Sequence, residues 1–204
     1  MTLSKAAGAC IMFWQFAFSS GANAVVFVSS DINTTPAPDN FSICFDNSCQ
    51  SISQLALSDD QWQGIRAIFL PGSETAGEER AMIGKAVARL EQIVGPMTGT
   101  ENDKGLNKSS GNPAGHRMDC IDESTNTTTY LYMMQQDGLL KWHRLRDPVT
   151  RGFFIFGWPH TTAVIESRED HSLWAVDSWF YDNGLAPEIL PLEQWQEGWR
   201  PAGS

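Results

Sequence analysis

The sequence predicts an α+β domain in which helices pack on an antiparallel sheet, and two observations lead to this class. Between residues 58 and 136, apolar residues recur at helical spacing behind residues that cap helices. Beyond Gly138, short runs rich in β-branched and aromatic residues alternate with turn signals, as expected of antiparallel strands. No internal repeat divides the chain, so we expect a single domain over residues 25–204.

Residues 1–24 have the three parts of a secretory signal peptide. Lys5 is followed by an apolar stretch from Ala6 to Phe18 and by the small-residue ending Ala22-Asn23-Ala24. A membrane anchor needs about 20 unbroken apolar residues, which this stretch does not supply. A lipoprotein signal through Cys10 would leave too short a segment after Lys5. We therefore expect cleavage after Ala24 and export to the periplasm or the medium.

The charge of the chain disfavours nucleic acid as a partner. The formal net charge is -10 at pH 7, and loss of Lys5 with the signal peptide makes it more negative by one. No cluster of Lys or Arg compensates, and binding to a phosphate backbone depends on such clusters. After the signal peptide no second apolar run is long enough to span a membrane, and no glycine-rich loop indicates a cofactor.

The four cysteines are expected to have different fates. Cys10 leaves with the signal peptide. A two-residue turn at Asp46-Asn47 would place Cys44 directly across a hairpin from Cys49, and an oxidising compartment would join the two in a disulfide. Cys120 then remains as the single free thiol, which is either a reactive group or a buried, inert cysteine.

Capping residues predict two helices in the first half of the chain. Ser58 precedes a short helix through Phe69. Thr75 and Glu78 form a capping-box signal for a helix over residues 76–94, which we expect Gly95-Pro96 to end.

A long loop and a third helix follow. Residues 97–118 are rich in Gly, Asn, Ser and Thr, and a loop of this length in a compact domain is often functional. Asp119 then begins a segment through Gln136 that reaches Gly138, a residue suited to ending a helix.

Strands are predicted in the remainder of the chain. The expected strands cover residues 139–145, 153–156, 160–165 and 173–179, with turn signals at Asp147-Pro148 and Arg168-Glu169-Asp170. They are expected to form one antiparallel sheet, and residues 187–199 to form a short strand and a turn of helix that close over it.

Cys120, His160 and Asp177 follow one another in an order that suits nucleophilic catalysis. A thiol in the first turn of a helix lies at the positive end of the helix dipole, which favours the thiolate. A histidine can take the proton of the thiol, and a carboxylate on its other ring nitrogen fixes its tautomer. With a four-residue loop at Ser167–Asp170, His160 would lie directly opposite Asp177, whereas a two-residue loop would shift this register.

Other residue types near this constellation offer competing interpretations. The negative charges of Asp119, Asp122 and Glu123 would raise the pKa of the thiol, unless Asp119 caps the helix. His116 is a rival base, and His143 and His171 are expected at the surface or at an edge of the sheet. Cys120, His160 and Asp177 also suit zinc by ligand type, but no Cys-x-x-Cys or His-x-x-x-His pair accompanies them.

The stretch from Gly115 to Phe180 resembles the transglutaminase-like branch of the papain-like cysteine-enzyme superfamily. In that branch a helix that starts at the cysteine precedes a strand opening with histidine and another ending in aspartate. Cys120-Ile121-Asp122, His160-Thr161-Thr162 and Trp174-Ala175-Val176-Asp177 stand in these places, with Thr161-Thr162 where the family often has Ala-Trp. The resemblance implies a papain-like or transglutaminase-like core.

By this resemblance Cys120 is the nucleophile, His160 the general base and acid, and Asp177 the orienting group. The chain would then be an exported thiol-dependent hydrolase or acyl transferase acting on amide bonds of peptides or cell-envelope material. The alternative is a non-catalytic envelope binding module on the same fold, with residues 97–118 as the contact surface.

Overall fold

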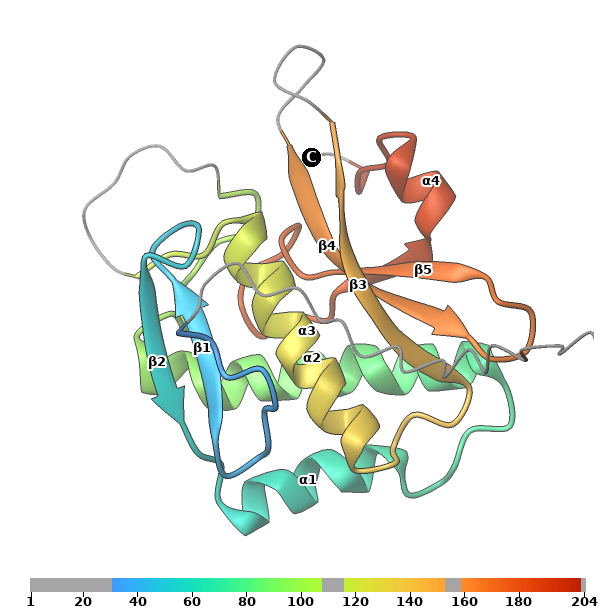
Figure 1. Cartoon of the computed structure of the whole chain (residues 1–204), viewed down its shortest axis with the longest axis horizontal. Coiled ribbons are helices and arrows are strands. Elements are labelled where there is room, and N and C mark those ends of the chain that lie inside the picture. Colours follow the sequence, from blue (N-terminus) through green and yellow to red (C-terminus); the bar gives the residue numbers. More distant parts are fainter. Residues whose placement is uncertain (1–30, 108–115, 153–158, 203–204) are drawn as a thin grey trace, which may run out of the picture.

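Helix α3 (Cys120–Gln136) lies at the centre of the molecule, between two antiparallel sheets (Figure 1). The computed structural model describes residues 31–107, 116–152 and 159–202. The predicted signal peptide and the predicted strand over residues 153–156 lie outside these ranges. None of the helices in the described ranges is long and apolar enough to cross a membrane.

The two sheets and the helices confirm the predicted α+β class. The smaller sheet pairs β1 (Phe41–Phe45) with β2 (Ser51–Leu55). The larger sheet has the order β3 (His143–Arg151), β4 (His160–Ser167), β5 (Leu173–Asp177) and β6 (Glu188–Pro191). The other helices are α1 (Asp59–Phe69), α2 (Ala76–Thr98) and α4 (Leu192–Gln196). As expected, β6 and α4 form a strand and a turn of helix.

Ser58 and Thr75 cap α1 and α2 as predicted, but the Glu78 carboxylate accepts from the Glu74 N–H, so the predicted capping box of α2 is only half formed. Ser58 and Thr75 accept hydrogen bonds from the backbone three residues on. Helix α2 is also longer than expected. The helix continues through Gly95-Pro96, since a proline removes a single N–H donor and this one lies close to the helix end. It ends at Gly99, whose φ of 76° is left-handed, so the expected stop at Gly95 is wrong.

Strand β3 also differs from the prediction. The expected strand over residues 139–145 begins at His143 instead, and it continues through Asp147-Pro148 to Arg151. The predicted turn is a β-bulge, because the register shifts between Arg146 and Val149. A proline is tolerated there because β3 is an edge strand. The ladder of hydrogen bonds is also interrupted at a bulge, so the proline, which has no N–H, removes no bond between the strands.

Both faces of β4 are covered, which explains why the whole strand is buried. Ala163 and Ile165 belong to the main core, which they share with residues of α2 and α3. Val164 points to the other face, where it packs with Leu190 and Trp195 beneath α4. Alternate residues of a strand share a face, so His160 lies on the α4 side of the sheet.

Candidate active site

The N-terminal turn of α3 presents Cys120 and is capped by acidic side chains. The Asp119 carboxylate accepts hydrogen bonds from the backbone N–H groups of Ile121 at 2.9 Å and Asp122 at 3.1 Å. Asp122 in turn accepts from the backbone N–H of Asp119 at 3.0 Å, which completes a capping box. The prediction of Asp119 as N-cap is confirmed.

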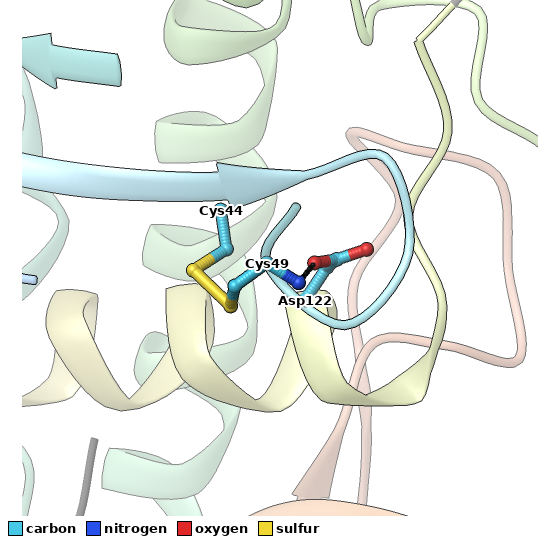
Figure 2. Close-up of side chains that lie close together, drawn as sticks. All are labelled: Cys44, Cys49 and Asp122. Carbon is cyan, nitrogen blue, oxygen red and sulfur yellow. Dashed lines mark hydrogen bonds between the residues drawn. A yellow bond between two sulfur atoms is a disulfide. The ribbon is translucent and has the colours of Figure 1, made fainter. Parts of the chain in front are cut away.

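The predicted disulfide between Cys44 and Cys49 is present, but it closes a different turn from the one expected (Figure 2). Cys44 lies opposite Ile52 in the β1–β2 ladder, so the expected position opposite Cys49 is wrong. The two-residue turn is replaced by a longer one in which Asp46 through Cys49 all have φ between 55° and 68°. Non-glycine residues seldom adopt this left-handed conformation, so the surroundings must hold the turn in place.

Hydrogen bonds join the turn that the disulfide closes to the start of α3 and to the residues just before it. The Cys49 backbone N–H donates to Asp122 Oδ1 at 2.6 Å (Figure 2), and Ser48 Oγ donates to Asp119 Oδ2 at 3.2 Å. The Asp46 backbone N–H donates to the Arg117 carbonyl at 2.6 Å. The disulfide turn therefore supports the segment that carries Cys120.

This region also holds the one group of metal-ligand atoms found among the described residues. The ligand atoms of Cys44, Cys49 and Asp122 lie within 4.8 Å of one another. The two sulfur atoms are bonded to each other, and metal ligation requires thiolates. In the disulfide form these residues therefore support the fold and do not offer a metal site.

Replacing both Cys44 and Cys49 by serine is expected to lower the free energy of unfolding by about 2 kcal/mol. The value follows from the small loop that the bridge closes, because loop entropy in the unfolded chain grows with loop length. Urea unfolding under non-reducing conditions measures the change. The control is Cys120→Ser, which keeps the bridge. Equal stability of the wild type and the double variant would contradict the expectation.

His160 and Asp177 form the closest pair in the candidate site. His160 Nε2 lies 2.7 Å from Asp177 Oδ2, and both side chains are buried. Asp177 also accepts from the indole N–H of Trp195 at 2.6 Å and from the backbone N–H of Trp179 at 3.2 Å. The rings of Trp179, Phe180 and Trp195 surround the imidazole, with centroids 4.6 to 5.4 Å from it.

The register that produces this pair differs from the prediction. Ala163 pairs with Val176, so His160 and Asp177 are offset by two positions and do not lie directly opposite each other. The loop does have four residues, but it starts one residue later, because the Ser167 N–H donates to the Ser172 carbonyl. Diagonal neighbours on one face remain within reach of a long side chain, which explains why the contact survives the shift.

Cys120 approaches the same end of the sheet from the α3 side. His160 is the first residue of β4 and Asp177 the last residue of β5, so both lie at this end. The Cys120 Sγ lies 3.9 Å from the Pro159 carbonyl oxygen, next to His160 in the chain. His160 Nδ1 is buried and has no hydrogen-bond partner among the described residues. The structure thus pairs His160 with Asp177, while the hydrogen bond of the thiol goes to Pro159.

The surroundings of Cys120 favour the protonated thiol. Burial, together with the negative charges of Asp119 and Asp177, raises the pKa of the Cys120 thiol to about 11. Of the three neighbouring acidic residues, Asp119 therefore has the expected effect, even though it caps the helix. At neutral pH the thiol needs a base to become a nucleophile.

The other histidines have structural partners. His116 Nδ1 lies 3.0 Å from an Asp46 carboxylate oxygen. His143 lies on the edge strand β3, one of the two expected positions, but it is fully buried there, with Nδ1 3.0 Å from Glu79 Oε1. The reason is that Glu79 on α2 covers this edge of the sheet. His171 lies in the β4–β5 loop, exposed as expected, and pairs with Glu166.

A group of buried acidic residues lies between α2, α3 and the loop after α2. Burial raises the pKa of Glu91 to about 7, of Asp122 to about 7 and of Asp103 to about 6. Burial, together with the charge of Glu91, also raises the pKa of Glu123 well above its usual value. Glu91 and Glu123 line the same small cavity, and no feature of the sequence distinguishes them from exposed helical glutamates.

A groove of about 370 Å³ lies near the opposite end of α3 from Cys120, lined by Trp62, Arg66, Met133 and Asp137 among others. Within the groove, Arg66 pairs with Asp137, to which the Trp62 indole N–H also donates. Its position near the far end of α3 separates the groove from the candidate active site.

Comparison of the chain with family models, curated proteins and solved structures finds no match in any of the three.

Proposed function

We propose that the chain is an exported thiol-dependent enzyme that acts on amide bonds of peptides or cell-envelope material, with a transglutaminase-like core. The observation that carries the proposal is the His160–Asp177 pair, whose 2.7 Å contact uses Nε2 and leaves the buried Nδ1 without a partner among the described residues. A buried polar atom without a partner calls for an explanation, and general-base function supplies one. The nearby thiol of Cys120 is the natural proton donor.

The proposed reaction begins with transfer of the Cys120 proton to His160 Nδ1. The sulfur attacks the carbonyl carbon of the amide, and the backbone N–H of Cys120, which the Asp119 cap does not engage, stabilises the oxyanion. His160 then returns the proton to the leaving amine as the C–N bond breaks, which leaves an acyl-enzyme. Water or a second amine attacks this thioester and releases Cys120, so the net reaction is hydrolysis or acyl transfer.

This mechanism requires Cys120 and His160 to come into contact during the reaction. Cys120 lies beside Pro159, the residue before His160 in the chain, and catalytic hydrogen bonds often tighten only when substrate binds. Because burial raises the pKa of the thiol to about 11, thiolate forms at neutral pH only if His160 acts as its base. Thiol reactivity therefore reports directly on the proposed pair.

Alkylation of Cys120 by iodoacetamide at neutral pH tests the proposal. In the wild-type protein we expect labelling at least about tenfold faster than in His160→Ala, because the variant lacks the base. The matched control is His171→Ala, which removes an exposed histidine outside the site and should leave the rate unchanged. Equal rates in the wild type and His160→Ala would contradict an active thiol.

A non-catalytic binding module on the same fold is the second candidate. It is favoured by the contact of the Cys120 thiol with the Pro159 carbonyl and by the raised pKa of that thiol. In this case residues 97–118 would form the contact surface. The described part of this segment is held against the site, because the Trp179 indole N–H donates to the Asn107 carbonyl at 2.7 Å. Equal labelling of wild type and His160→Ala would support this function.

A further inference from the structure

Asp177 is held by more donors than His160 alone. Trp195 of α4 donates its indole N–H to Asp177 Oδ2 at 2.6 Å, which is the same oxygen that His160 Nε2 contacts at 2.7 Å. The backbone N–H of Trp179 donates to the other oxygen, Oδ1, at 3.2 Å. All of these groups are buried. The carboxylate therefore has little freedom to rotate or to exchange partners.

The chemistry of these donors determines which nitrogen of His160 carries the proton. An indole N–H and a backbone N–H can only donate, so both contacts require Asp177 to act as acceptor. Oδ2 of Asp177 accepts from the Trp195 indole and also contacts His160 Nε2, so the geometry assigns Nε2 as the donor toward this oxygen. Nδ1 then keeps its lone pair, and it is the buried nitrogen that has no hydrogen-bond partner among the described residues.

Trp195 is itself fixed in place from two sides. Its ring is fully buried and packs with Val164, Ala175 and Leu190 on the α4 face of the sheet. Arg151 lies on β3, with its guanidinium 4.3 Å from the centroid of the Trp195 ring. The guanidinium also donates a hydrogen bond to the backbone carbonyl of Trp195. The indole N–H is therefore held in one direction, toward Asp177.

We propose that Trp195 is a positioning residue, which holds Asp177 Oδ2 where it accepts from His160 Nε2 and thereby sets the tautomer of His160 with Nδ1 free to take a proton. The inference rests on the proposed function, because a free Nδ1 matters for chemistry only if His160 is a base. It deepens that function by adding the C-terminal helix to the machinery. The effect of Trp195 passes through Asp177, and its indole contacts neither Cys120 nor a substrate in this proposal.

Trp195→Phe tests this role, because it keeps a large aromatic ring and removes the N–H. The ¹⁵N chemical shifts of the His160 ring distinguish a protonated nitrogen from one with a lone pair. In the wild type we expect the Nε2–H tautomer, and in Trp195→Phe a mixture with the Nδ1–H tautomer. Cys120 alkylation should slow about threefold to tenfold, the loss expected for one hydrogen bond. Trp199→Phe, in the same C-terminal segment, is the matched control and should change neither measurement.

A second variant guards against an effect of folding. Replacing Trp195 by 3-benzothienylalanine puts a sulfur where the indole N–H stood and preserves the shape of the ring, so it should reproduce both changes. The two changes should also vanish when Trp195→Phe is made in an Asp177→Ala background, since the acceptor is then absent. Unchanged shifts and unchanged alkylation in both Trp195 variants would overturn the proposal. Alkylation that never depends on His160 would instead refute the proposed function, while the ¹⁵N shifts still decide the role of Trp195.

Discussion

Raising the pH from about 5 to about 7.5 is expected to lower the free energy of unfolding by roughly 5 kcal/mol. Burial raises the pKa of Glu91 and Asp122 to about 7 and that of Asp103 to about 6. The unfolded chain releases these protons near pH 4, so the folded state binds more protons throughout this window. Stability is therefore greatest at its acidic end and is lost as the pH rises through the folded-state pKa values. Urea unfolding at a series of pH values measures the change.

A single variant shows whether the buried acidic group causes this dependence. Glu91→Gln removes one of the titrating carboxyls and keeps an oxygen that can accept from the Gly184 N–H. In this variant the free energy of unfolding should therefore fall less between pH 5 and 7.5 than in the wild type. The matched control is Glu101→Gln on the exposed loop after α2, which should leave the decline unchanged. A stability that stays constant or increases between pH 5 and 7.5 in the wild type would contradict the expectation.

Glu79→Ala is expected to lower the free energy of unfolding by about 3–5 kcal/mol, because several buried hydrogen-bond donors would lose their acceptor. The fully buried carboxylate of Glu79 accepts from the backbone N–H groups of Lys141, Trp142 and His143 at 2.7 to 3.0 Å, and His143 Nδ1 lies at 3.0 Å. The alanine variant would leave these donors buried without an acceptor. Urea or thermal unfolding measures the loss.

The neighbouring glutamate provides the control for this prediction. Glu78 precedes Glu79 on α2 and is exposed, so Glu78→Ala should cost no more than about 1 kcal/mol through its contact with the Glu74 N–H. Similar losses in the two variants would show that the first turn of α2, and not the buried carboxylate, accounts for the stability.

Local signals in the sequence predicted the features that depend on a few adjacent residues. Ser58, Thr75 and Asp119 cap the three long helices as expected, because a capping side chain needs only backbone groups two or three residues away. The Cys44–Cys49 disulfide was predicted correctly for the same reason, since the two residues are five positions apart. The turn between them was not, because its left-handed residues are held by α3.

The sequence failed where the outcome depends on distant partners. His143 carries no sign of burial, and Glu79, which buries it, lies 64 positions away. The β4–β5 register changed because the loop starts one residue later than expected, a shift that depends on small differences in turn energy. Nothing near Trp195 indicates that its indole would reach Asp177, because α4 meets β5 only in the folded chain.

The disulfide of the turn beneath Cys120 and the free thiol of Cys120 itself are stable under opposite redox conditions. The Cys44–Cys49 bridge forms in an oxidising medium. The same medium can oxidise the free thiol of Cys120, whose helix start is supported by the same turn. Oxidants attack thiolates, so the raised pKa of Cys120 protects it from oxidation. A consequence for the bench follows from this arrangement. The reductants customarily added to thiol enzymes would loosen the support of Cys120, and the protein should be purified and assayed without them.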